Sequence, residues 1–133
     1  MTIKRTKTHR GFKIGEFEDC YGNKCSIQES SLATKNCIWL GIDDAKPQVM
    51  AREHPELANG ETTGWVPYPI PDDVLLQTRM HLTQKQAKEL AKSLLYFVKY
   101  GWLPKTAKDA NHHFKMLTAW RPKVTVDKEE KPV

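Results

Sequence analysis

The segment from Val74 to Tyr100 changes from a two-residue to a 3.6-residue hydrophobic repeat, which predicts a strand followed directly by a helix. In the strand, the even-numbered positions from Leu76 to Leu82 are expected to face the core. Gln77, Arg79 and His81 then share the opposite face. A strand that presents these three polar side chains next to a helix is a candidate recognition surface.

The helix has clear start and stop signals. Thr83 with Gln86 matches a capping box, and Gly101 is typical of the residue that ends a helix. The apolar stripe, which should pack on the sheet, comprises Ala87, Leu90, Ala91, Leu94, Leu95, Phe97 and Val98. The opposite face carries Lys85, Lys88, Lys92 and Lys99 and is expected to be solvated. A second helix is predicted over residues 106–120.

Three further strands are predicted nearer the N-terminus. Residues 11–28 resemble a hairpin with its turn at residues 21–24, and Gly15 is expected to mark a bulge that moves Phe17 onto the face of Ile14. Residues 37–43 form the third strand, with Ile38, Leu40 and Ile42 in the core and Trp39 on the other face. The basic residues 1–11 are expected to be a flexible arm and residues 122–133 a flexible tail.

These elements predict a single α+β domain over residues 12–121. Its antiparallel sheet has about four strands and is packed by one amphipathic helix, with a second helix towards the C-terminus. Residues 43–73 are rich in proline, which breaks long elements. They form either an excursion with short elements or a functional loop, and in extended form they can cover one side of the sheet.

Charge is distributed unevenly along the 133 residues, which carry a net +5. Residues 1–13 hold five basic groups and no acid, residues 14–78 have a net charge of −7, and residues 79–122 have a net charge of +7. The basic charge thus lies on an arm and a helical half, while the strand-rich half is acidic. Nucleic-acid binding is therefore an alternative that the charge permits and does not favour.

The composition argues against several chemistries. The three cysteines, Cys20, Cys25 and Cys37, have no common zinc spacing and are interpreted as reduced thiols, so no metal is expected. The sequence has no phosphate-binding glycine loop and no HExxH or GxSxG motif. Pairing Cys25 with His81 as a nucleophile and base fails because the two are predicted on opposite faces. We therefore expect no catalytic residues, no cofactor and no enzymatic activity.

The polar face of the predicted sheet is the candidate ligand-binding surface. Trp can stack on a planar group, Arg can pair with phosphate or carboxylate, and Ser, Gln and His can hydrogen-bond the edges of a ligand. The alternative is that this face is merely solvated or is covered by residues 43–73. The candidate residues are Ser26, Gln28, Trp39, Gln77, Arg79 and His81.

Four separated segments support a family resemblance. The YG, CS-Q-SS, IWLG and RMHLT segments occur here in that order between residues 12 and 103. With these segments the chain resembles a family of small uncharacterised phage and bacterial proteins. Members of that family end soon after the first helix, so the extension from Pro104 departs from the family pattern. The resemblance implies a phage accessory protein with a counter-defence role, because such proteins often occupy a host component or sequester a nucleotide immune signal.

Three functional hypotheses follow. The first is non-catalytic binding of a small anionic or nucleotide-like ligand on the polar sheet face. The second is protein–protein inhibition of a host nuclease, similar to an anti-CRISPR protein, by an acidic surface that mimics nucleic acid. The third is nucleic-acid binding by the basic arm and the Lys-rich helix. A cytoplasmic location, that of the host if the chain is phage-encoded, and no membrane partner are expected because no apolar run is long enough to span a bilayer.

Overall fold

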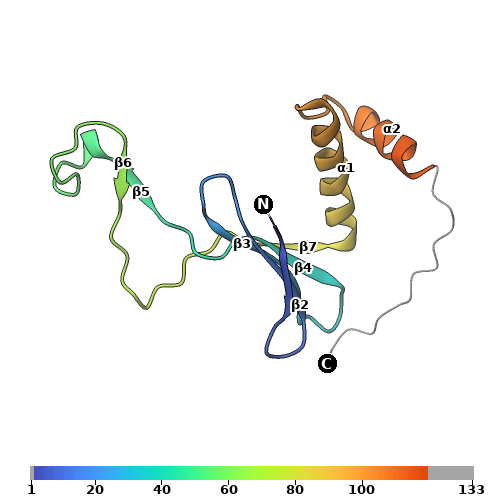
Figure 1. Cartoon of the computed structure of the whole chain (residues 1–133), viewed down its shortest axis with the longest axis horizontal. Helices are drawn as coiled ribbons and strands as arrows, with labels where there is room; N and C mark the ends of the chain where they lie inside the picture. Colours follow the sequence, from blue (N-terminus) through green and yellow to red (C-terminus); the bar gives the residue numbers. More distant parts are fainter. Residues whose placement is uncertain (1, 120–133) are drawn as a thin grey trace.

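The computed structural model describes residues 2–119, which form two antiparallel sheets and two helices (Figure 1). The large sheet has the strand order β1-β2-β3-β4-β7, and the small sheet pairs β5 with β6. The predicted α+β class is confirmed, with one strand more in the large sheet than predicted. The strands are β1 (Lys4–Lys7), β2 (Lys13–Glu18), β3 (Lys24–Glu29), β4 (Cys37–Ile42), β5 (Gln48–Met50), β6 (Trp65–Pro67) and β7 (Met80–Thr83).

The additional strand, β1, lies within the segment that was expected to be a flexible arm. It pairs with β2 in a register that sets Lys4 opposite Glu16. Opposite charges that face each other across two strands stabilise their pairing. The strand was not predicted because β1 has no alternation of apolar and polar residues. Residues 4–7 are therefore a sheet edge with exposed side chains.

The hairpin of β2 and β3 is confirmed, but the bulge at Gly15 is not. Ile14, Gly15, Glu16 and Phe17 pair in unbroken register with β3, so Phe17 lies on the face opposite Ile14. Gly15 is needed for a different reason. A Cβ atom on Gly15 would lie 2.8 Å from the Cγ2 atom of Ile3, so glycine allows the chain before β1 to approach the sheet.

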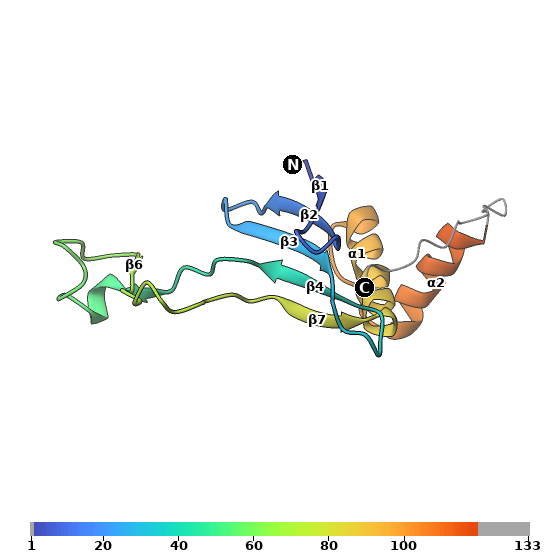
Figure 2. The same ribbon diagram turned by 90° about the horizontal axis from the view of Figure 1, so that it is seen from below.

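Residues 43–79 form a long two-legged excursion, here called the hairpin arm. Its legs are joined by hydrogen bonds such as that from the Ala45 N–H to the Leu76 carbonyl at 3.0 Å. At its far end, β5, a 3₁₀ turn (Ala51–Glu53) and β6 enclose a small core. Figure 2 shows the arm extending away from the large sheet. The alternative that residues 43–73 cover the sheet is therefore wrong.

Helix α1 (Gln84–Tyr100) begins and ends as predicted. Both hydrogen bonds of the Thr83–Gln86 capping box are present, and Gly101 ends the helix in the left-handed conformation at φ 82°. Thr83 is both the last residue of β7 and the helix N-cap, so no linker residues allow the helix to fold back across the sheet. As Figure 1 shows, α1 rises from the end of β7.

The apolar stripe of α1 is consequently not enclosed as predicted. No residue of α1 is buried, and the helix packs mainly on β7 and on α2 (Ala107–Thr118). The predicted end of the second helix and the tail at residues 122–133 lie outside the described residues. Within the described part, neither helix is long and apolar enough to cross a membrane.

Candidate ligand-binding site

The register of the large sheet brings four of the predicted residues onto one face. Gln28 of β3 lies opposite Trp39 of β4, and Trp39 lies opposite His81 of β7. Ser26 lies opposite Gly41 one pair further along. Because directly paired residues point to the same side of a sheet, these side chains form one surface across three strands.

At the centre of this surface, Trp39 and His81 stack. Their ring centroids are 4.1 Å apart and their planes differ by 22°. The His81 Nε2 atom lies 2.8 Å from the Oγ atom of Ser30, a buried hydroxyl just beyond β3. The imidazole is thus fixed by a ring contact on one neighbour and a hydrogen bond to another, although His81 is an exposed residue.

Arg79 is held over Trp39, with its guanidinium carbon 5.4 Å from the ring centroid. Its Nε atom lies 4.0 Å from an oxygen of Asp43, too far for a hydrogen bond, and that buried Nε atom has no hydrogen-bond partner. The same Asp43 oxygen accepts a hydrogen bond of 2.6 Å from Ser26, whose side chain is almost fully buried. Arg79 is therefore positioned by a ring and a nearby charge, and its donors remain available.

Two residues fix the backbone that carries Arg79. The Gln77 Oε1 atom accepts a hydrogen bond of 2.7 Å from the Arg79 N–H. Gln77 and Arg79 both lie before β7, which begins at Met80 and not at Val74 as predicted. The Gln77 amide is engaged with the Arg79 backbone, so Gln77 supports Arg79 instead of acting as a separate ligand contact. On β4, a Cβ atom on Gly41 would lie 2.5 Å from the Thr78 carbonyl oxygen, so only glycine allows this close approach.

Sequence reasoning missed three members of the site: Asp43, Ser30 and Gly41. Asp43 is the last residue of the predicted third strand and was not assigned to the site, yet it continues the odd-numbered face of Trp39 and Gly41. Ser30 likewise continues the alternation of Ser26 and Gln28. Following the two-residue period to the end of the predicted third strand finds Asp43, and extending it one step past residue 28 finds Ser30.

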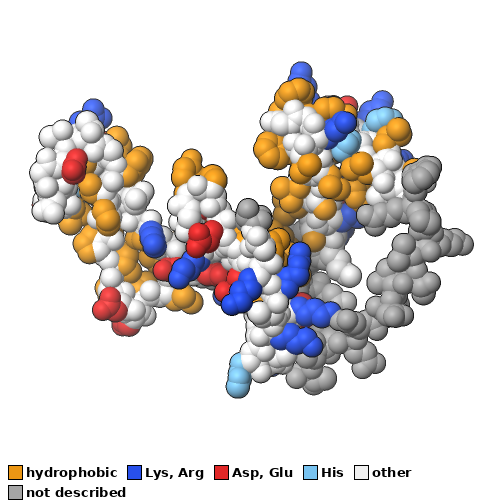
Figure 3. All heavy atoms as spheres, viewed as in Figure 1, with side chains coloured by type: hydrophobic (Ala, Val, Ile, Leu, Met, Phe, Trp, Pro, Cys, Tyr) orange, Lys and Arg blue, Asp and Glu red, His pale blue; other side chains and the backbone are white. Residues whose placement is uncertain are grey.

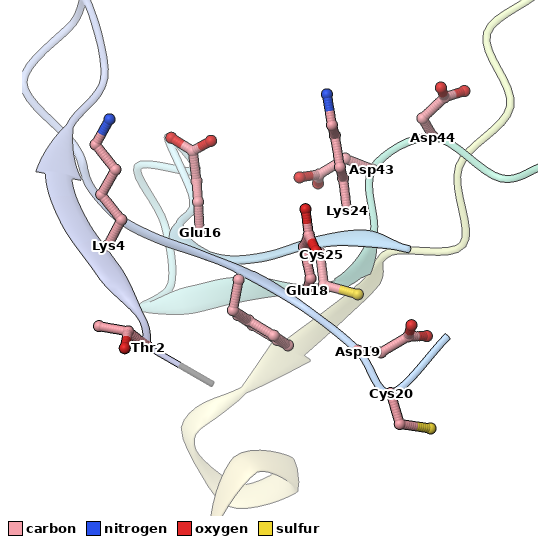
Figure 4. A pocket seen from close by; sticks show the side chains of 11 residues that line it. Thr2, Lys4, Glu16, Glu18, Asp19, Cys20, Lys24, Cys25, Asp43 and Asp44 are labelled. Atoms are coloured by element: carbon pink, nitrogen blue, oxygen red, sulfur yellow. The ribbon is translucent and has the colours of Figure 1, made fainter. Parts of the chain in front are cut away.

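Next to Asp43 lies a hollow of about 880 Å³, which we call the acidic hollow. Figure 4 shows Lys4, Glu16, Lys24 and Asp43 pointing to the same side of the sheet around it. Five carboxylates and two lysines line it, so the surrounding charge is predominantly negative. The charged residues are Lys4, Glu16, Glu18, Asp19, Lys24, Asp43 and Asp44.

The cysteines do not form a reactive or metal-binding group. Cys25 and Cys37 are buried and Cys20 is exposed, all as free thiols. Burial, with smaller effects of Asp19 and Asp43, raises the pKa of Cys25 and disfavours its thiolate. Among residues 2–119, no three His, Cys, Asp or Glu side chains gather in a way that can hold a metal ion.

Comparison of the chain with protein-family models, with curated proteins and with solved structures gave no match.

Proposed function

We propose that the protein is a non-catalytic accessory protein of a phage or mobile element that acts in the cytoplasm of the host. Its polar sheet face binds a small anionic or nucleotide-like ligand. The phage setting and the counter-defence role rest on the sequence resemblance, and the ligand class rests on the chemistry of the face.

The proposed ligand class rests on the Arg79 guanidinium, which is held in place and has N–H donors available. A guanidinium has five N–H donors in a planar fork that matches phosphate or carboxylate. Among residues 2–119, the Arg79 guanidinium donates no hydrogen bond, although Trp39 and the backbone around Gly41 fix its position. A pre-positioned guanidinium with available donors favours an incoming anion, because little side-chain entropy is lost on binding.

The neighbouring side chains suit a ligand that also has a planar part. Trp39 and His81 present a stacked pair of rings next to Arg79. Beside them, the Gln28 amide forms no hydrogen bond to a described residue and can pair with the edge of a base. Ser26 is engaged with Asp43, so in this proposal it orients that carboxylate instead of touching the ligand directly.

Calorimetric titration with cyclic di-AMP and cyclic di-GMP, and with pyrophosphate as an anion lacking a base, tests the proposal. We expect heat with at least one cyclic dinucleotide and an affinity at least about tenfold lower in Arg79→Ala, from the loss of a charge-assisted contact. Arg52→Ala is the matched control. It removes the same charge from an exposed site on the hairpin arm and should leave the affinity unchanged.

No heat with any of these probes, or equal affinity in wild type and Arg79→Ala, contradicts the ligand class. Binding of pyrophosphate as tight as that of the dinucleotides would remove the role given to Trp39 and His81 while leaving that of Arg79.

A second candidate function, inhibition of a host nuclease, is favoured by the acidic hollow. The five carboxylates that line it would supply the acidic surface that mimics nucleic acid: Glu16, Glu18, Asp19, Asp43 and Asp44. Glu16→Gln with Glu18→Gln should then weaken inhibition of a nuclease with a basic channel, and should leave dinucleotide binding at Arg79 unchanged. The reverse pattern would favour the ligand-binding function.

Nucleic-acid binding by the basic segments gains less support. Lys4 faces Glu16 across two strands, and the ammonium groups of Lys88 and Lys92 lie 5.9 and 5.8 Å from the centroid of the Phe114 ring. Lysines engaged in this way do not form one continuous surface for a polyanion. An affinity for nucleic acid that falls steeply with salt concentration would favour this function.

A further inference from the structure

The two helices pack through the polar side of α1. Lys92 donates hydrogen bonds of 2.7 Å to Asn111 and 2.9 Å to Glu89, and its side chain is only 13% exposed. Tyr96 and Tyr100 meet the ring of His113 edge-on, with centroids 5.7 and 5.6 Å apart. The lysine face that was expected to be solvated therefore contacts α2, and the apolar stripe remains open.

The open stripe is continuous. Leu90, Leu94, Phe97 and Val98 follow the i, i+4, i+7, i+8 spacing of a single helix face, and Leu94 and Val98 are 56% and 78% exposed. Figure 3 shows hydrophobic side chains gathered over α1. An exposed apolar stripe of this kind marks an interaction surface.

The chain exposes more surface than a compact protein of its mass. The chain exposes 11449 Å². A compact monomer of 15.3 kDa exposes about 7,100 Å². Even if residues 1 and 120–133 are given the unfolded-chain value, the described residues expose roughly 2,400 Å² more than a compact domain of their size. The hairpin arm and α1 both contribute exposed apolar residues to this excess. Each partner in a stable dimer buries about 800 Å² or more, so the excess leaves room for an interface of that size.

The residues around the stripe suit a second copy of the same chain. A twofold axis brings each surface against itself, so charged residues there would meet like charges. The stripe is flanked by Gln86 and Ser93 on one side and by Ala87 and Ala91 on the other, with no charge among them. The small alanines allow two helices to approach closely.

We propose that the α1 stripe packs antiparallel against the α1 stripe of a second copy of this chain, forming a twofold dimer. With the axis at Leu94, Leu90 of each copy meets Val98 of the other, so one register satisfies the whole stripe. The segment 120–133 is a poor alternative occupant, because half of its residues are charged.

Sedimentation equilibrium of the full chain from about 1 to 200 µM tests the dimer, because its population depends on concentration. We expect twice the chain mass of 15.3 kDa at the upper end. Leu94→Glu should weaken the dimer at least about 100-fold, because it places two carboxylates at the axis. Leu94 is exposed in the single chain, so this variant should keep its helical circular dichroism.

Leu75→Glu is the matched control. Leu75 is 77% exposed on the hairpin arm, which extends away from the large sheet on the side opposite α1 (Figure 2), and its substitution should leave the dimer constant unchanged. A mass of 15.3 kDa at every concentration overturns the proposal. It is equally overturned if Leu94→Glu leaves the mass of an oligomer unchanged, or if Leu75→Glu dissociates the dimer as strongly. If Leu94→Glu loses helicity, Val98→Glu, at a still more exposed position, serves in its place.

Discussion

Trp39 and His81 stack across the β4–β7 pair with their ring centroids 4.1 Å apart, and Ser30 holds the imidazole from the end of β3. This contact ties three strands of the sheet together at the surface proposed to bind the ligand. It also explains how a short strand such as β7, whose Leu82 alone is buried, keeps a fixed position.

The Ser30–His81 hydrogen bond should contribute measurably to stability. A double-mutant cycle with Ser30→Ala and His81→Ala is expected to give a coupling free energy of about 1 kcal/mol, typical of a hydrogen bond that is largely shielded by one buried partner. Urea denaturation of the four proteins provides the measurement. Additive effects of the two substitutions would show that the contact is not formed in solution.

Gly41 should be irreplaceable because of the backbone that lies against it. A methyl group there would lie 2.5 Å from the Thr78 carbonyl oxygen, so Gly41→Ala is expected to lower the free energy of unfolding by about 2 kcal/mol or more. It should also weaken ligand binding, because residues 78 and 79 must move.

The control for this prediction is Gly60→Ala. Gly60 has φ +89° but no atom within 4 Å of its added methyl group, so the expected loss is only about 1 kcal/mol. Equal losses in the two variants would contradict the close approach described for Gly41.

Cys25 should react much more slowly than Cys20. Burial raises the pKa of Cys25 and shields its sulfur, whereas Cys20 is exposed. At about pH 8, labelling with iodoacetamide followed by peptide mass spectrometry should modify Cys20 first. Comparable rates at the two thiols would mean that the β2–β3 hairpin opens readily.

The turn between β2 and β3 should lose stability in acid. Hydrogen bonds from the Asn23 side chain and backbone lower the pKa of Asp19, so its carboxylate is favoured in the folded state. The resulting stabilisation is present above the ordinary carboxyl pKa and is lost as the pH falls through the lowered value. An NMR titration should show this midpoint moving upward in Asn23→Ala, and an unchanged midpoint would contradict the assigned cause.

Local signals in the sequence predicted the junction of β7 and α1 well. The capping box and the terminal glycine depend on nearest neighbours, and both appear in the structure. The alternation is confirmed only over Met80–Thr83, because β7 begins at Met80 and not at Val74, and of the positions expected in the core only Leu82 is buried there. The polar face was predictable for the same reason, because successive side chains in a strand alternate between the two faces of the sheet.

Features that depend on contacts between distant segments were not predictable. The pairing of β1 depends on Glu16, twelve residues away, and the need for glycine at position 15 depends on Ile3. The burial of the α1 stripe was assumed because amphipathic helices usually cover a sheet. Only the structure shows that Thr83 leaves no linker and that α2 contacts the lysine face instead.

The Arg79 guanidinium is proposed to capture an anion, and a gain of affinity is the sharpest evidence for this role because misfolding cannot imitate a gain. Asp43 competes for Arg79 from 4.0 Å, and Asn at this position can still accept the Ser26 hydrogen bond. Calorimetric titration with cyclic di-AMP and cyclic di-GMP should therefore show about tenfold tighter binding in Asp43→Asn. Asp44→Asn, the same charge change on the adjacent exposed residue, should show little difference. Unchanged or weaker binding in Asp43→Asn, or an equal gain in Asp44→Asn, would contradict capture of the anion by Arg79.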